Sequence, residues 1–397
     1  MFLTEWICKF VIWSIIDAPV NIIFQDAFYN RDGSIFNFHI IHPMRFVWNV
    51  LSRGELGFGE SYRDGDWRLD EDADLGQFMK TMAAQRRDGW IEFLKHWLPM
   101  AWIRRITFDM TEMDTQKAQS AVEESYDATK HMCDIMLDDK YGMYTSAYYK
   151  NPSDSLQEAQ INKLTLVAEK SKITGTGQGQ RLLDIGCGYG GAMRFMKERF
   201  PDLTVMGNTN SPEMAKSAAD KYEEQFNVAN SVTHGDYREL EGELFDAIIS
   251  LGMIEHIGEN QYADYASKIS SLLRKGGRVV IQTVNAKAWN NPTVHSKQKP
   301  PADSFVMEYI FPGAHIPHLD WIHEHLSKDF WLIHTETFGH SYELTVRDWR
   351  LRLESHQNVH QDIPEKDFRG FQYYLAWCEA GFGNEYHQLS QMVFEKK

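Results

Sequence analysis

The chain has 397 residues, 43% of them hydrophobic and 24% charged, which is enough for about two domains with buried cores. Its formal net charge of −15 argues against a general nucleic-acid-binding protein, because binding to phosphates requires a basic surface. The four cysteines are scattered and form no CxxC pair, which argues against a disulfide framework or zinc ribbon and favours a reducing cytosol.

Short apolar segments and turn signals dominate the start of the chain, and they indicate a small α+β domain with a linker over residues 1–105. The longest apolar run of its first segment, Phe10–Ile16, is too short to cross a bilayer. We interpret this segment as amphipathic, either docked on the first domain or lying on lipid. Residues 86–105 interleave tryptophans with Arg and Lys, which suits either a membrane interface or a helix between domains.

The rest of the chain, residues 106–397, alternates strand-like and helical segments. The strand-like runs are RLLDIG, LTVMGN, SVTHGD, FDAIISLG and RVVIQTV. This alternation predicts an α/β fold with a doubly wound, mostly parallel sheet. The interval 285–326 interrupts the alternation and is interpreted as an insertion after the fifth strand. The final run, Gln388–Lys396, is predicted to be an edge strand.

The stretch LLDIGCGYGG places several glycines, including Gly186 and Gly188, at the first strand-to-helix turn. The missing side chains let a ligand approach the backbone closely. A P-loop would need Gly-Lys-Ser/Thr at the end of this turn, and a dinucleotide fold usually has an acid at the end of the second strand; neither is present.

S-adenosylmethionine is the third candidate ligand for this turn. Asp184 could position its cationic amino-acid end, and Asp236 could accept a hydrogen bond from its adenine amino group. The same two residues could instead cap the turn and start a helix. Together with the glycines they favour S-adenosylmethionine over NAD.

Several ordered motifs then resemble one family. The stretch SLGMIEHIGENQYADYASKISSLLRKGGRVVIQTV is similar to the cyclopropane-fatty-acyl-phospholipid synthase family, which also includes methyltransferases that add methyl branches to unsaturated acyl chains. SYDATKHMCDIMLDDKYGMYTSAYY, EYIFPGAHIPHL, FGHSYELTVRDWRLRLE and YYLAWCEAGF resemble further family segments in the same order, and GELGFGESYRDGDW resembles the smaller N-terminal domain. The resemblance implies a seven-stranded S-adenosylmethionine-dependent methyltransferase sheet, an N-terminal lipid-binding or accessory domain, and a homodimer formed through that domain.

The resemblance also implies the reaction. The double bond of an unsaturated phospholipid acyl chain attacks the methyl carbon of S-adenosylmethionine, a carbocation forms, and loss of a proton from the added methyl closes a cyclopropane ring. Such chemistry requires a dry channel, aromatic walls and a base. In the family that base is a bound bicarbonate ion.

Carried over from the family, the positions that hold bicarbonate are Ser146, Glu255, Gln282, Val284 and Tyr342. Glu255 and Tyr342 agree with the family pattern, and Val284 contributes its backbone. The family usually has Cys at position 146 and His at position 282. Because Gln cannot titrate near neutral pH and His can, these departures weaken ring closure more than methyl transfer, and a methyl-branched or methylene-branched product is the alternative within the family.

Other site residues follow from the same comparison. Tyr126 and Tyr144 align with aromatic residues near the reacting centre, although on their own they read as core tyrosines. The family's ribose-binding segment corresponds to TNSPEM, in which Met214 replaces the usual Gln. The predicted cofactor-binding residues are Asp184, Gly186, Gly188, Thr209, Ser211, Asp236, Tyr237 and Tyr144.

The histidines of HIPHLDWIHEH have a spacing that could hold a metal, but the matching family segment has no metal role, and we predict none. The leading hypothesis is a cytoplasmic enzyme associated peripherally with the inner face of the membrane. Two other functions stay open: a small-molecule N-methyltransferase on the same scaffold, which would need no bicarbonate, and a non-catalytic protein that binds S-adenosylmethionine or lipid.

Overall fold

The structure is a computed structural model that describes residues 20–24, 27–29, 35–84, 130–175, 179–242, 244–286, 304–356 and 363–397. These residues form two compact units. The first contains the described parts of Met1–Met136, Asp303–Pro312 and Val346–Asn384, and the second those of Leu137–Ala302, Gly313–Thr345 and Glu385–Lys397. The boundary expected near residue 105, the tryptophan-rich stretch 86–105, the amphipathic start and Tyr126 lie outside the described residues.

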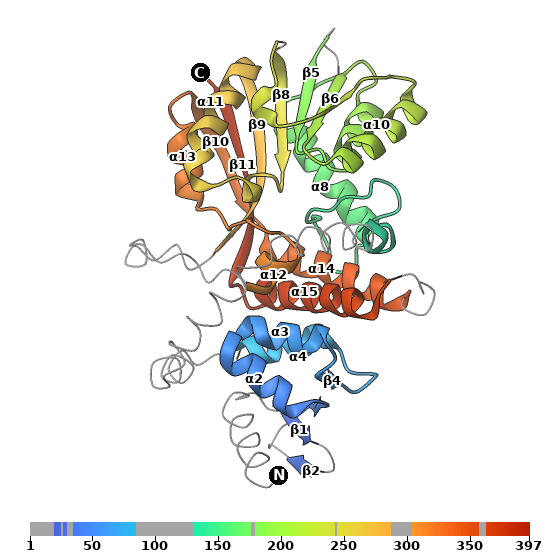
Figure 1. Ribbon diagram of the computed structural model, residues 1–397. Coiled ribbons are helices and arrows are strands. Elements are labelled where there is room, and N and C mark those ends of the chain that lie inside the picture. The colour runs from blue at the N-terminus through green and yellow to red at the C-terminus, as the bar shows by residue number, and fades with distance from the viewer. Residues whose placement is uncertain are drawn as a thin grey trace. The chain divides into compact units, whose positions relative to one another are not determined.

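The second unit is built on a seven-stranded sheet with the order β10-β11-β9-β8-β5-β6-β7 (Figure 1). Its strands are β5 (Arg181–Ile185), β6 (Thr204–Thr209), β7 (Val232–His234), β8 (Phe245–Leu251), β9 (Leu273–Ala286), β10 (Phe330–Thr337) and β11 (His387–Lys396). Strands β5 to β9 pair in parallel, whereas β11 and then β10 pair antiparallel. The predicted mostly parallel α/β sheet is therefore confirmed.

The prediction that the final strand lies at a sheet edge is wrong. β11 lies between β9 and β10, and the edge strand is β10. The burial of the two strands gives the reason: β11 buries both faces, with Leu389, Met392 and Phe394 nearly inaccessible, while Trp331 of β10 is 61% exposed. A strand buried on both faces is central, wherever it falls in the chain.

Helices cover both faces of this sheet. Helices α8 (Leu156–Lys170), α9 (Gly191–Arg199) and α10 (Pro212–Phe226) contribute to the core on one face, and α11 (Tyr262–Leu272) and α13 (Leu319–Leu326) to the core on the other. The start of α8 is fixed by a capping box in which Ser155 and Glu158 satisfy each other's backbone N–H groups. Within the interval expected to be an insertion, α13 thus packs like a regular crossover helix.

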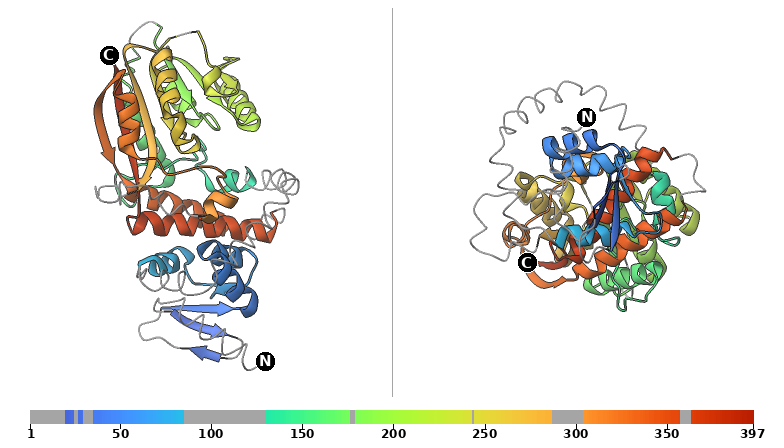
Figure 2. Two further views of the ribbon diagram at one scale, coloured as in Figure 1. Left: turned by 60° about the vertical axis from the view of Figure 1, so that its left-hand side comes forward. Right: turned by 90° about the horizontal axis from the view of Figure 1, so that it is seen from below.

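The first unit contains a small sheet with the order β2-β1-β3-β4. Its elements are β1 (Val20–Phe24), β2 (Ala27–Tyr29), β3 (Phe36–Ile40), α2 (Pro43–Arg53), α3 (Glu55–Arg63), β4 (Trp67–Leu69), α4 (Leu75–Ala84), α12 (Ser304–Tyr309), the second half of α14 (Gly339–Ser355) and α15 (Glu365–Gly383). Figure 2 shows the sheet, then α2 to α4, then α15 as successive layers.

Aromatic side chains form the core of this unit. The ring of Phe38 is fully buried and contacts Phe46 of α2, Phe58 of α3, Phe78 of α4 and Trp67 of β4, with ring centroids 4.9 Å apart in the last pair. The sheet and the three helices therefore share one core.

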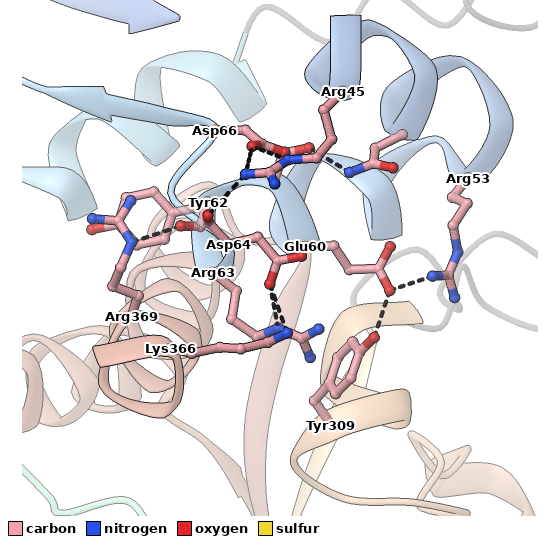
Figure 3. Close-up of polar contacts among 12 residues, drawn as sticks. Arg45, Arg53, Glu60, Tyr62, Arg63, Asp64, Asp66, Tyr309, Lys366 and Arg369 are labelled. Atoms are coloured by element: carbon pink, nitrogen blue, oxygen red, sulfur yellow. Dashed lines mark hydrogen bonds and ion pairs between the residues drawn. The ribbon is translucent and has the colours of Figure 1, made fainter. Parts of the chain in front are cut away.

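Ion pairs and hydrogen bonds join the N-terminal part of this unit to α12 and α15 (Figure 3). The buried carboxylate of Glu60 accepts hydrogen bonds from Arg53 and from the Tyr309 hydroxyl of α12. Lys366 of α15 pairs with Asp64 at 2.9 Å. A buried carboxylate needs such partners, because an unpaired charge in the interior is costly.

Replacing Tyr309 by Phe is expected to lower the free energy of unfolding by about 1–3 kcal/mol, the usual cost of removing a partner from a buried charged group. The substitution removes the phenol as a donor, and among the described residues the Glu60 carboxylate keeps the hydrogen bond from Arg53. Urea unfolding of the full chain measures the change. An unchanged value would mean that Arg53 alone satisfies this carboxylate.

None of the helices in the described part of the chain combines the length and the apolar character needed to cross a membrane.

Candidate functional site

The glycine turn joins β5 to α9. Gly186, Gly188 and Gly190 adopt left-handed backbone angles, with φ of 80°, 52° and 75°. The N–H groups of Gly186 and Cys187 donate to the carbonyl of Asn208 at the end of β6, at 2.8 and 3.0 Å. A Cβ on Gly186 would lie 2.8 Å from Cβ of Met253, so the turn packs directly against the loop that follows β8. Only glycine meets both requirements at position 186.

The predicted ribose-binding residues lie at the end of β6. Thr209 is the last residue of that strand and is 5% exposed. Ser211 caps α10, and its hydroxyl accepts the N–H of Met214 at 3.3 Å. Since β5 and β6 are parallel neighbours, both residues lie at the same sheet edge as the glycine turn, where ligands of open α/β sheets bind.

Asp236 and Tyr237 follow β7 at this edge. Asp236 accepts the backbone N–H of Arg238 and forms a two-point pair with its guanidinium, at 2.9 and 2.6 Å. Hydrogen bonding to Arg238 holds the pKa of Asp236 below its usual value, so this residue is a carboxylate at neutral pH. It also caps a short 3-10 helix, as the alternative interpretation expected. Tyr237 is buried, with its ring edge against Tyr265.

Glu255 lies in the loop after β8. Its Oε1 accepts the backbone N–H of Val284 in β9 at 2.8 Å, while Oε2 is buried and has no hydrogen-bond partner among the described residues. Burial raises the pKa of Glu255 to about 7, against the opposing effects of the backbone N–H groups of Val284 and Glu255 and of the Thr283 side chain. Glu255 and Val284, which the sequence placed together, are thus in direct contact, and a carboxyl oxygen remains available to a ligand.

Ser146 is fully buried in the segment that precedes α8, and its hydroxyl donates to the carbonyl of Ala147 at 3.0 Å. The N–H of Ala147 donates to the hydroxyl of Thr345 at 3.0 Å, and that of Tyr149 to the hydroxyl of Ser341 at 3.1 Å. Both acceptors are in the first turns of α14, on either side of Tyr342.

The segment around Ser146 also meets the loop that carries Glu255. A Cβ on Gly252, whose φ is 71°, would lie 3.0 Å from Cγ2 of Thr145. The segments of Ser146, Glu255, Val284 and Tyr342 are therefore linked by direct contacts in one unit.

Gln282 lies in β9, two residues before Val284, and is 1% exposed. Its Oε1 accepts from Nε2 of Gln391 in β11 at 2.8 Å, and Oε1 of Gln391 in turn accepts from Lys170 at 2.6 Å. The amide is thus engaged with the neighbouring strand. Tyr144 is half-buried beside Thr145.

Sequence reasoning missed a group of buried polar residues on α8 and in the segment that precedes it. Lys163 of α8 is fully buried, and its ammonium donates to Thr145 Oγ1 at 2.8 Å. The side chain of Gln160, one turn earlier, donates to the Thr145 carbonyl at 2.9 Å. Asp138 accepts the N–H groups of Tyr141 and Met143 at 2.7 and 2.8 Å. The sequence showed a glutamine and a lysine three residues apart on one predicted helix. Such a pair is normally exposed, so it did not indicate a buried polar group.

The histidines of residues 315–325 do not form a metal site in the described structure, where no three His, Cys, Asp or Glu side chains are grouped to hold an ion. Nε2 of His315 instead lies 2.6 Å from the hydroxyl of Tyr262. The backbone N–H of His315 donates to the carbonyl of Glu255 at 2.9 Å. This histidine therefore supports the loop that carries Glu255.

Known proteins resemble this chain over most of its length. A family model described as mycolic acid cyclopropane synthetase matches residues 113–392. The cyclopropane-fatty-acyl-phospholipid synthase of Escherichia coli K12 is 31% identical over 352 residues, which cover 88% of this chain and 86% of the relative. A probable fatty acid methyltransferase of Mycobacterium tuberculosis is 28% identical over 399 residues, covering 92% of this chain and 88% of the relative.

Solved structures of methyltransferases and cyclopropane synthases are also similar to this chain. The cyclopropane synthase MmaA2 of Mycobacterium tuberculosis superposes with a TM-score of 0.62 and 25% identity, covering 68% of this chain and 95% of that one. Coclaurine N-methyltransferase, solved with N-methylheliamine and S-adenosylhomocysteine, gives a TM-score of 0.61 over 87% of this chain and all of its own, but at 18% identity this likeness shows the fold alone.

Proposed function

Because the chain belongs to the cyclopropane synthase family of S-adenosylmethionine-dependent enzymes, we propose that it adds the methyl carbon of S-adenosylmethionine to the double bond of an unsaturated phospholipid acyl chain and closes a cyclopropane ring there. The main support for this proposal is the length of the chain that matches a cyclopropane-fatty-acyl-phospholipid synthase. The match to the Escherichia coli synthase covers 88% of the chain, more than residues 113–392, and so includes part of the N-terminal region as well as the catalytic one.

The residues at the sheet edge suit S-adenosylmethionine, which supplies an electrophilic methyl group when bound. The left-handed glycines leave the backbone open, and Asp184, buried just before them, provides a carboxylate for the cationic amino group. Thr209 and Ser211 lie where the ribose would reach the end of β6. Although Asp236 is paired with Arg238, a carboxylate has lone pairs to spare for the adenine amino group.

We also propose that bicarbonate is the base. The buried Oε2 of Glu255 offers an acceptor for the hydroxyl of this anion, and the Tyr342 phenol would donate to it. Because the Val284 N–H is engaged with Oε1, its part in the site is to orient Glu255. In ring closure a proton leaves the added methyl for the base, and the electron pair of that C–H bond forms the new C–C bond to the cationic carbon.

A methyl-branched product is the second candidate. Gln282 is tied to Gln391 and cannot titrate, and Ser146 donates to a backbone carbonyl. A weaker hold on the base gives the cation more time to lose a proton from a neighbouring chain carbon instead, and the electron pair of that C–H bond then forms a double bond beside the methyl branch. The probable fatty acid methyltransferase of Mycobacterium tuberculosis, which matches 92% of this chain, is consistent with this outcome.

We propose a peripheral position at the cytoplasmic face of the membrane, where phospholipid chains are reached. Three apolar side chains on and just before α2 support it, since Ile41, Met44 and Trp48 are 44%, 59% and 58% exposed and have helical spacing. Exposed apolar side chains of this kind suit an interfacial helix. Dimer formation through the N-terminal domain stays a prediction.

Purified protein incubated with S-adenosylmethionine and vesicles of a monounsaturated phospholipid should add one CH2 unit to the acyl chain, with release of S-adenosylhomocysteine. Gas chromatography with mass spectrometry separates cyclopropane from methyl-branched esters. Vesicles of saturated lipid and a panel of small amines are the controls. Methylated amines without lipid product would support the N-methyltransferase alternative, and cofactor binding without any product would contradict an enzymatic function.

A further inference from the structure

Lys163 is a buried cation that the proposed reaction does not use. It lies on the face of α8 that packs on the sheet, is fully buried, and has one hydrogen bond among the described residues, to Thr145 Oγ1 at 2.8 Å. An ammonium carries three donors and is costly to bury without an anion nearby. A negative charge close to this position would favour the charged form of the lysine.

Two carboxylates, Asp138 and then Asp184, act electrostatically on Lys163, and they differ in the hydrogen bonds that they already accept. Asp138 uses both oxygens to accept backbone N–H groups, from Tyr141 and Met143. Asp184 is 2% exposed and lies in β5 immediately before the glycine turn. Of the two carboxylates, Asp184 therefore lies closer in sequence to the turn that would hold the cofactor.

We propose that Lys163 is a positioning residue for S-adenosylmethionine: its positive charge keeps Asp184 ionised to hold the amino group of the cofactor, and its bond to Thr145 fixes the segment that carries Tyr144 and Ser146. This inference rests on the proposed cofactor. One side chain thus links the cofactor turn to the substrate side of the site, and Thr145 in turn contacts Gly252 on the loop of Glu255.

The pKa shifts of Asp184 and Lys163 have the directions that this proposal requires. Burial raises the pKa of Asp184 to about 7, and Lys163 opposes this rise. Burial lowers the pKa of Lys163 to about 7, and Asp138 and Asp184 oppose that change. Among the described residues, Asp184 also acts electrostatically on Cys187, whose pKa burial raises, so that it stays a neutral thiol. Arg194 faces Asp138. Removing the lysine charge therefore leaves Asp184 with burial alone, and more of it becomes protonated at neutral pH.

The test is the affinity for S-adenosylhomocysteine, measured by calorimetry from pH 6 to 8.5 on wild type and Lys163→Met. The variant is expected to bind roughly fivefold more weakly at pH 7, because a smaller fraction of Asp184 is ionised there, and to recover affinity as the pH rises. Protonation of the ligand itself affects wild type and variants equally, so it cancels when their pH dependences are compared.

Lys170→Met is the matched control. It removes a lysine from the same helix that pairs with Glu336 at 2.7 Å and does not face Asp184. It should keep the wild-type pH dependence. In Asp184→Asn, the Lys163→Met change should have no further effect on the pH midpoint, because the titrating group is gone.

A Lys163→Met protein that is folded by circular dichroism and binds with wild-type affinity and pH midpoint would overturn the inference. Equal losses in Lys163→Met and Lys170→Met would also overturn it, because the effect would then be structural. These outcomes are distinct from failure of the proposed function, in which the wild type itself would not bind the ligand or would not modify lipid.

Discussion

Replacing Glu255 by Gln is expected to lower kcat by about 10²- to 10⁴-fold, the usual contribution of acid–base groups, while leaving the affinity for S-adenosylmethionine within a few-fold of wild type. The reason lies in the geometry. Glu255 Oε1 can be replaced by an amide oxygen that still accepts the Val284 N–H, but the buried Oε2 becomes an NH2 group. An amide NH2 group there cannot accept a hydrogen bond from the hydroxyl of the proposed bicarbonate.

The same substitution is expected to stabilise the folded protein at alkaline pH. Burial raises the pKa of Glu255 from its ordinary 4.5 to about 7. The unfolded chain therefore loses this proton at lower pH than the folded chain, and wild-type stability falls as the pH rises from about 4.5 to about 7. Glu255→Gln has no such loss, so its free energy of unfolding should exceed that of wild type at pH 8 by on the order of 3 kcal/mol.

Activity and stability thus move in opposite directions, which a merely damaged protein would not show. The measurements are kcat on unsaturated vesicles and urea unfolding, each at pH 6 and pH 8, with wild-type kcat rising over this interval as the carboxyl ionises. Glu169→Gln, on the exposed side of α8, is the control and should change neither quantity. A Glu255→Gln protein with wild-type kcat would remove this residue from the chemistry.

The sequence predicted the elements that depend on local patterns. The five parallel strands follow apolar runs, and the turn at Gly186 follows from glycines whose left-handed angles other residues rarely adopt. The edge assignment of Gln388–Lys396 failed because strand order depends on pairing between distant segments, here β11 with both β9 and β10. Likewise, packing of α15 against α3 and α4 joins segments about 300 residues apart and leaves no local signal.

The site shows the same division. Motif resemblance indicated Glu255 and Val284, and the structure places them in contact. It did not indicate Lys163, because a lysine within SLQEAQINKL has the composition of an exposed helix face. Lys163 becomes buried only when α8 packs on the sheet. The hydrophobic periodicity of the sequence does not predict this packing.

The combined change of Gln282 to His and Ser146 to Cys is expected to raise the ratio of cyclopropane to methyl-branched product by about tenfold or more, equivalent to about 1.4 kcal/mol between competing barriers. In wild type the Gln282 amide is bound to Gln391, which is itself bound to Lys170. An imidazole at position 282 titrates near neutral pH, so it can hydrogen-bond to the proposed bicarbonate and accept its proton. Removal of a proton from the added methyl should then compete better with proton loss from other carbons.

Product analysis on monounsaturated phospholipid vesicles gives this ratio directly. Gln282→Leu is the control: it breaks the same bond to Gln391 but supplies no titratable group, so it should not increase ring closure. Both changes at position 282 leave Nε2 of Gln391 without its present acceptor and should lower the free energy of unfolding by about 1–3 kcal/mol. If the double variant kept the wild-type ratio while remaining folded, ring closure would not be limited by these two positions, and the branching outcome would have to be set by Glu255 and Tyr342 or by the shape of the acyl channel.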